Sequence, residues 1–112
     1  MNGLKKRIMG MDIFLVEYQG KDKDGYLKTK SVEKEYDWDS TRYTVRHRFA
    51  KEVEQEELTS GIYGDWEAIS RPTDFNLAFS WAETLTPEEQ PYIKKILTIL
   101  QSNDKLYLEY SH

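Results

Sequence analysis

One amphipathic segment near the carboxyl end of the chain constrains the fold more than any other feature. Its apolar residues are spaced as i, i+3, i+4 and i+7 and so share one face of an α-helix: Ile93, Ile96, Leu97 and Leu100. The preceding Thr86-Pro87-Glu88-Glu89 is typical of a helix start, with threonine as the cap and proline at the first position. Pro91 lacks the N–H of a continuous helix, so we expect a kink or a restart there, and an end at Asn103.

Two segments at opposite ends of the chain are predicted to be strands. Met11–Tyr18 carries apolar residues on both faces, which indicates a central position in a sheet. Lys105–Ser111 alternates between apolar and polar residues, and we expect it beside the first strand. Gln19–Gly25 has the composition of a turn. Tyr26–Lys34 is predicted to be an edge strand, because lysine commonly guards an exposed edge.

The spacing of the apolar residues changes in the middle of the chain. Thr41–Phe49 alternates and contains β-branched and aromatic residues, which predicts a third strand. Ala50–Ser60 is rich in helix formers and predicts a short acidic helix that ends before the next glycine. Glu35–Ser40 is expected to be a loop. Gly61–Pro72 is expected to be a connector with a short strand at Trp66–Ile69.

The apolar residues of Thr73–Leu85 fit both the two-residue period of a strand and the 3.6-residue period of a helix. The length of the segment, together with an N-cap candidate at Thr73, favours a helix.

The predicted strands lie mainly in the first part of the chain and the predicted helices mainly in the second. This order predicts an α+β fold, a small single domain with an antiparallel or mixed sheet of about four strands and two or three helices packed on one face. We expect residues 11–112 to form this domain. We expect residues 1–10 to be a basic leader that is either disordered or, if translation begins at Met11, not part of the protein.

Acidic residues are concentrated in one part of the chain. The 112 residues carry 16 basic and 20 acidic side chains, a formal net charge of −4. Residues 52–93 alone hold ten acids and a single base, Arg71. A region of one sign attracts partners of the opposite sign and speeds their association. The alternative is that these acids only form a solvated surface, as charged runs usually do.

The composition argues against most catalytic chemistry. The chain has no cysteine, which excludes thiol catalysis and thiolate metal ligands and is consistent with a cytoplasmic protein. His47 is the only internal histidine, and the predicted strand places it among core residues. No stretch is long and apolar enough for a membrane helix. We therefore expect no enzyme activity, no metal and no cofactor; the acid pairs Asp37/Asp39 and Asp65/Glu67 make hydrolysis the least favoured alternative.

We predict a partner-binding site between residues 52 and 67. It combines four glutamates with a glycine-flanked loop that carries acidic and aromatic side chains: Glu52, Glu54, Glu56, Glu57, Tyr63, Asp65, Trp66 and Glu67. Aromatic side chains anchor protein interfaces, and charges at the rim set the association rate and selectivity. The competing interpretation is that Tyr63 and Trp66 fill the seam between the sheet and the helices.

These features lead to the hypothesis of a small acidic binding protein that occludes a basic protein partner. Immunity proteins against nuclease toxins and phage-encoded inhibitors of nucleic-acid enzymes are similar in size and charge, although no shared motif supports the comparison. A second hypothesis is a nucleic-acid-binding module that uses Arg42, Arg46 and Arg48 on one strand face. A third is a self-assembling structural or accessory subunit with contacts through Tyr26–Lys34 and Phe75–Trp81. The sequence leaves the oligomeric state open.

Overall fold

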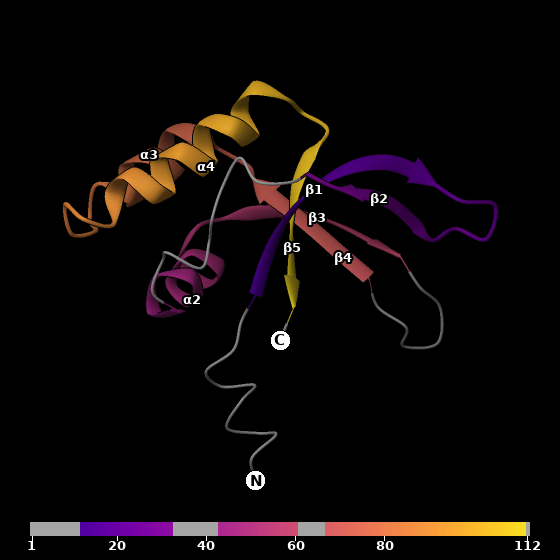
Figure 1. The fold of residues 1–112 in the computed structure, drawn as a ribbon, viewed down its shortest axis with the longest axis horizontal. Helices are drawn as coiled ribbons and strands as arrows, with labels where there is room; N and C mark the ends of the chain where they lie inside the picture. Colours follow the sequence, from indigo (N-terminus) through magenta and orange to yellow (C-terminus); the bar gives the residue numbers. More distant parts are fainter. Residues whose placement is uncertain (1–11, 33–42, 61–66, 112) are drawn as a thin grey trace, which may run out of the picture.

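The computed structural model describes residues 12–32, 43–60 and 67–111, which form one antiparallel sheet and three helices (Figure 1). In chain order the elements are β1 (Asp12–Lys21), β2 (Leu27–Ser31), α2 (Tyr43–Glu52), β3 (Gln55–Ser60), β4 (Glu67–Pro72), α3 (Phe75–Ala82), α4 (Gln90–Ser102) and β5 (Leu106–Ser111). The strands are ordered β2-β1-β5-β4-β3. The predicted α+β class is confirmed, with five strands where about four were expected.

β1 and β5 lie side by side in the sheet, as predicted, with β2 on the other side of β1 (Figure 1). The main core lies between the sheet and the helices and contains Ile13 and Leu15 of β1 with Leu106 and Leu108 of β5. On the opposite face of β1, Val16 is buried but Phe14 is 50% exposed. The predicted burial of both faces is therefore complete on the helix side and partial on the other.

The turn predicted at Gln19–Gly25 is present but shorter, because β1 continues to Lys21 and the turn begins at Asp22. Asp22 Oδ1 accepts hydrogen bonds from the backbone N–H groups of Asp24 and Tyr26, at 2.8 and 3.0 Å. Gly25 has a φ of 88°, a left-handed conformation that favours glycine. β2 is an edge strand with exposed lysines, in agreement with the prediction for Tyr26–Lys34 as far as residue 32. The rest of that segment and the predicted loop at residues 35–40 lie outside the described residues.

Two predictions in the middle of the chain are wrong. The segment predicted as a strand, Thr41–Phe49, lies largely in α2, and Ala50–Ser60 contains the end of α2 and then β3 instead of a helix. The reason is that Val45, Phe49 and Val53 lie four residues apart, so the segment fits a helical period as well as an alternating one. All three side chains are buried in the main core, which selects the helix.

The predictions for the second half of the chain are mostly confirmed. The short strand expected at Trp66–Ile69 is present as β4, which begins at residue 67 and continues to residue 72. α3 is helical, as favoured, but its N-cap is Asp74 rather than Thr73, since Asp74 Oδ1 accepts from the backbone N–H of Leu77 at 3.1 Å. Helix α4 begins at Gln90, with Glu89 rather than the predicted Thr86 as its N-cap and Pro91 in its first turn. Residues 86–89 form a separate turn before it, which agrees with the predicted restart at Pro91. Its predicted stripe is fully buried, with Ile93, Ile96, Leu97 and Leu100 at 0% exposure.

The sheet curves so strongly that its two edge strands meet at one corner. The backbone N–H of Leu27, at the start of β2, donates to Ser60 Oγ at the end of β3, at 3.0 Å. The register between β1 and β2 shifts between Tyr18 and Lys21, around Gly20 with a φ of 87°, and such an irregularity bends a strand. Beneath this corner Ile69 is buried on the face opposite the helices. The residues of β3 that precede Ser60 are exposed or half-buried.

Candidate functional site

The glutamates predicted as a binding site begin at the end of α2 and continue along β3, an edge strand of the sheet. All four, Glu52, Glu54, Glu56 and Glu57, are exposed. The register pairs Glu57 with Ser70 and Ser70 with core residue Leu108, so Glu57 lies on the helix-bearing face. Glu56 lies on the other face, because successive strand residues point in opposite directions. The glutamates therefore surround one edge of the sheet instead of forming a flat patch.

Glu52 is held within the molecule. Its carboxylate accepts hydrogen bonds from Arg48 Nε at 3.0 Å and from Trp81 Nε1 at 2.9 Å. The Arg48 guanidinium also lies over the Trp81 ring, 5.6 Å from its centroid. The hydrogen bond from Arg48, and next the one from Trp81, lowers the pKa of Glu52 below its ordinary value. Glu52 thus ties α2 to α3 and is the least available of the four glutamates.

The other three glutamates are held less firmly. Glu54 accepts one hydrogen bond, from Thr73 Oγ1 at 2.9 Å. Glu56 Oε1 lies 4.0 Å from Arg71 Nε, and the Glu56 side chain is 60% exposed. Glu57 forms no hydrogen bond or ion pair with another described residue. These three carboxylates are therefore accessible to a partner without the loss of a strong internal contact.

Arg71, the single base within residues 52–93, is used inside the fold. It is only 7% exposed, and its guanidinium nitrogens Nη1 and Nη2 donate to three backbone carbonyls at 2.8–3.1 Å, those of Leu100, Asn103 and Leu106. Its guanidinium also lies over the rings of Phe75 and Tyr107. Carbonyls at the end of a helix favour a cation, so Arg71 stabilises the end of α4 and its connection to β5.

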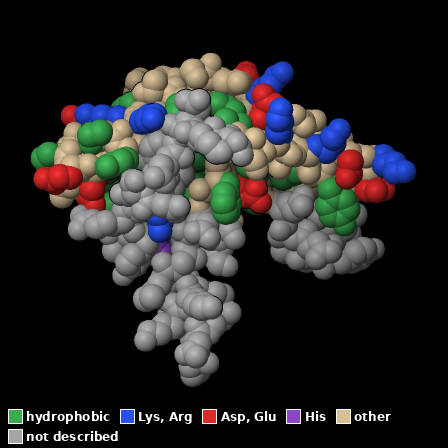
Figure 2. All heavy atoms as spheres, viewed as in Figure 1, with side chains coloured by type: hydrophobic (Ala, Val, Ile, Leu, Met, Phe, Trp, Pro, Cys, Tyr) green, Lys and Arg blue, Asp and Glu red, His purple; other side chains and the backbone are tan. Residues whose placement is uncertain are grey.

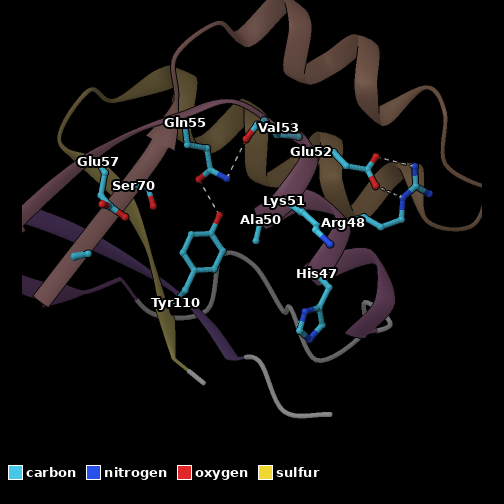
Figure 3. A pocket seen from close by; sticks show the side chains of 11 residues that line it. His47, Arg48, Ala50, Lys51, Glu52, Val53, Gln55, Glu57, Ser70 and Tyr110 are labelled. Carbon is cyan, nitrogen blue, oxygen red and sulfur yellow. Dashed lines mark hydrogen bonds and ion pairs between the residues drawn. The ribbon is translucent and has the colours of Figure 1, made fainter. Parts of the chain in front are cut away.

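A groove of about 1020 Å³ lies beside β3 on the helix-bearing face (Figure 3). Side chains from α2, from Val53 just after it and from strands β3, β4 and β5 line it: His47, Arg48, Ala50, Lys51, Glu52, Val53, Gln55, Glu57, Ala68, Ser70 and Tyr110. Figure 3 shows the Arg48–Glu52 pair well away from Tyr110, which points toward Gln55. His47 is half-buried in a helix and lines this groove, whereas the sequence predicted it on a strand with core residues.

The hydroxyl of Tyr110 is a structural donor in this groove. It donates to Gln55 Oε1 at 2.8 Å, and Gln55 Nε2 in turn donates to the backbone oxygen of Val53 at 3.4 Å. Burial raises the pKa of Tyr110 well above its ordinary value. Tyr110 therefore stays protonated at neutral pH and fixes the start of β3 against β5.

The structure describes only part of the predicted site. Tyr63, Asp65 and Trp66 lie outside the described residues, as do Asp37 and Asp39. For Glu67, the structure gives its place at the start of β4 but not its side chain. Two of the glutamates are held by residues outside the predicted site, Glu52 by Trp81 and Glu54 by Thr73. No sequence pattern indicates these contacts, because they join residues that are far apart along the chain.

The arginines of the nucleic-acid hypothesis do not share a strand face. Arg46 and Arg48 lie in α2, where residues two positions apart point about 200° apart around the helix axis. Arg48 is also paired with Glu52. Arg42 lies outside the described residues. The common face on which that hypothesis rested is therefore missing for Arg46 and Arg48.

Charged side chains of both signs lie over the β1–β2 hairpin at the right of Figure 2. This hairpin carries the exposed lysines Lys21, Lys23, Lys28 and Lys30.

The described part of the chain contains no group of three or more metal-ligating side chains. None of its helices has the length and apolar character needed to cross a membrane.

No family model, no curated protein and no solved structure matches the chain.

Proposed function

We propose that the protein is a small acidic binding protein without catalytic activity, which occludes a basic protein partner through the edge formed by β3. The observation that carries this proposal is that the negative charges at this edge are exposed, whereas the nearby positive charge is buried. Glu54, Glu56 and Glu57 are exposed, while Arg71, the single base of the acidic stretch, is buried in bonds to backbone carbonyls. Like charges held close together repel each other, so this edge gains from a basic partner.

Two aromatic residues, Tyr63 and Trp66, follow Glu57 by six and nine positions in the sequence. In this proposal, Tyr63 and Trp66 serve as anchors of the interface, and Asp65 and Glu67 add to its negative charge. An acidic surface of this kind speeds association with a basic surface and confers selectivity for it. The proposed role is that of a cytoplasmic inhibitor that masks the basic surface of a nucleic-acid enzyme, as an immunity protein or a phage-encoded inhibitor would.

The test is capture of the partner by the immobilised full-length chain from a lysate of its own organism, with washes at about 50 and about 300 mM salt. The key variant carries E54Q, E56Q and E57Q. Glu52 is left unchanged because it holds Arg48 and Trp81. A control variant carries E88Q, D104N and E109Q, which remove the same number of negative charges from exposed positions elsewhere.

We expect one basic protein at close to equal stoichiometry, lost at the higher salt concentration and lost from the β3 variant. The control variant is expected to retain it. Equal capture by the two variants would contradict the proposal, because net charge alone would then explain the binding. Recovery of nucleic acid in place of a protein would contradict it as well.

A further inference from the structure

We propose that β3 is an open strand edge that takes an extended basic segment of the partner as a sixth strand of the sheet. This inference rests on the proposed function and specifies how the partner is held. Addition of a strand to a sheet edge derives its affinity from backbone hydrogen bonds and its selectivity from alternate side chains. Both ingredients are present along the residues from Gln55 to Thr59.

The backbone groups of β3 that face away from β4 can be assigned from the hydrogen bonding. The N–H of Thr73 donates to the backbone oxygen of Glu54 at 3.2 Å, and the register continues from this pair to Glu56 with Arg71. Hydrogen-bonded and non-hydrogen-bonded pairs alternate in an antiparallel ladder. Gln55, Glu57 and Thr59 therefore direct their N–H and C=O groups to the open edge.

Pro72 is consistent with this assignment. It lies opposite Gln55 in the register, in a pair that exchanges no hydrogen bond across the β3–β4 ladder. Proline has no N–H to donate, so only such a position leaves the ladder intact. The outward direction of the groups of Gln55 thus agrees both with the bond between Thr73 and Glu54 and with the placement of Pro72.

The edge is accessible over most of its length. Glu57 and Thr59 are exposed, and no described strand pairs with β3 on its outer side. The contact with the other edge strand is at the far end, where the N–H of Leu27 donates to Ser60 Oγ. Edge strands usually carry charges that prevent uncontrolled pairing, and on β3 these charges are acidic on both faces.

This distribution of charge selects a basic occupant. A strand added beside β3 has side chains on both faces, within about 5 Å of the Cβ atoms of its cross-strand neighbours. Lysine or arginine at those positions would pair with Glu57 on the helix-bearing face and with Glu56 on the other. An acidic or apolar segment would leave these carboxylates unpaired. A basic extended segment of the partner protein therefore fits this edge best.

A second copy of the chain is the competing occupant, because β2 carries Lys28 and Lys30. The outer side of β2 is, however, engaged at its start by the bond from Leu27 to Ser60 of the same molecule. A β2 strand could add to another copy only by giving up this contact. The extended segment of a different protein has no such cost.

The probe is a seven-residue peptide, Lys-Lys-Val-Val-Lys-Lys-Val, titrated into the full-length ¹⁵N-labelled chain; its paired lysines lie on both faces of an extended strand. We expect the amide signals of Glu57 and Thr59 to shift and to gain protection from hydrogen exchange. A peptide with N-methyl groups on the residues that face β3 keeps its charge but cannot donate. It is expected to bind about fivefold more weakly for each hydrogen bond removed.

The matched variants are T59P and T59V. The N–H of Thr59 points away from β4, so proline removes an outward donor without a change of charge, while valine keeps that donor. We expect the peptide to bind T59V normally and T59P at least about fivefold more weakly. If T59P does not fold, the N-methylated peptide makes the same comparison with the unaltered chain.

The outcomes separate this inference from the proposed function. If the variant E54Q/E56Q/E57Q loses the captured partner while N-methylation and T59P leave peptide binding unchanged, strand addition is wrong and the binding role stands. If the triple variant keeps the partner, the proposed function itself fails. A defined oligomer of the protein alone in light scattering, abolished by T59P, would identify the occupant as a second copy and overturn the inference.

Discussion

Arg71 and the glutamates of β3 lie on neighbouring strands, yet the molecule uses their charges in opposite ways. Arg71 is buried, with hydrogen bonds from its guanidinium to three backbone carbonyls and ring contacts on Phe75 and Tyr107. Glu57 is exposed and makes no hydrogen bond or ion pair with another described residue. The positive charge thus serves stability, and the negative charges remain available for binding. Substitution of Arg71 should therefore lower the stability of the fold, and substitution of the glutamates should weaken partner binding.

The largest effect is expected when Arg71 is replaced by methionine. Methionine fills part of the space but cannot donate to the carbonyls of Leu100, Asn103 and Leu106. The first two carbonyls keep a backbone N–H donor, from Asn103 and Leu106, whereas the carbonyl of Leu106 loses the donor that Arg71 provides. An unsatisfied buried carbonyl costs about 1–3 kcal/mol and each other lost hydrogen bond about 1 kcal/mol, so we expect the free energy of unfolding to fall by about 3 kcal/mol in urea denaturation.

Two comparisons test whether the geometry of Arg71 causes this loss. R71K retains the charge but not the planar fork, so it is expected to recover only part of the stability. R48M removes an exposed arginine that pairs with Glu52 and is expected to cost far less. Similar losses for R71M and R48M would show that burial does not distinguish the two arginines.

A smaller effect is expected for Y110F, which removes the hydroxyl that donates to Gln55. The loss of this part-buried hydrogen bond should lower the free energy of unfolding by about 1 kcal/mol. Burial raises the pKa of Tyr110, so its stabilising contribution is complete below the ordinary tyrosine pKa of about 10 and is lost as pH rises above it. The unaltered protein should therefore lose stability at alkaline pH more steeply than Y110F, which unfolding curves at several pH values can check.

On the acidic side, E54Q/E56Q/E57Q is expected to change the free energy of unfolding by less than about 0.5 kcal/mol, since these side chains are exposed. The same variant should lose the basic partner. Thermal and urea unfolding measure the first property, and capture at low salt measures the second. A large loss of stability would mean that these glutamates belong to the fold, in the way that Arg71 does.

The smallest effect concerns Glu52, the one glutamate of the predicted site that is tied to α3. The hydrogen bonds from Arg48 and Trp81 lower its pKa, so their stabilising contribution is present above the ordinary glutamate pKa and is lost as pH falls below it. R48M should shift the pKa of Glu52 upward toward its ordinary value, as measured by NMR titration of the side-chain carboxyl carbon. No change in this pKa would contradict the observed network.

The fold could be predicted from the sequence where the spacing of the apolar residues fits only one kind of element. The stripe of α4 and the apolar segments of β1 and β5 each fit one element only, and all three are present. The spacing of Val45, Phe49 and Val53 fits two periods, and the core that decides between them is formed by distant residues. The strand prediction there failed for this reason.

The candidate site was predictable in composition but not in geometry. The sequence shows that the glutamates are clustered, and the structure shows that β3 divides them between two faces of an edge. The contact that holds Glu52 joins residues 29 positions apart, and the bond between Tyr110 and Gln55 spans 55 positions. Such pairs depend on the packing of α3 and β5 and leave no local pattern in the sequence.

The binding role of Glu54, Glu56 and Glu57 is tested most directly by the affinity of E54Q/E56Q/E57Q for the captured basic partner, measured by calorimetry beside the unaltered protein at several salt concentrations. We predict a loss of affinity of about tenfold or more at low salt and a weaker dependence on salt, because rim charges govern both. An unchanged affinity with an unchanged salt dependence would contradict the assignment of these charges to binding.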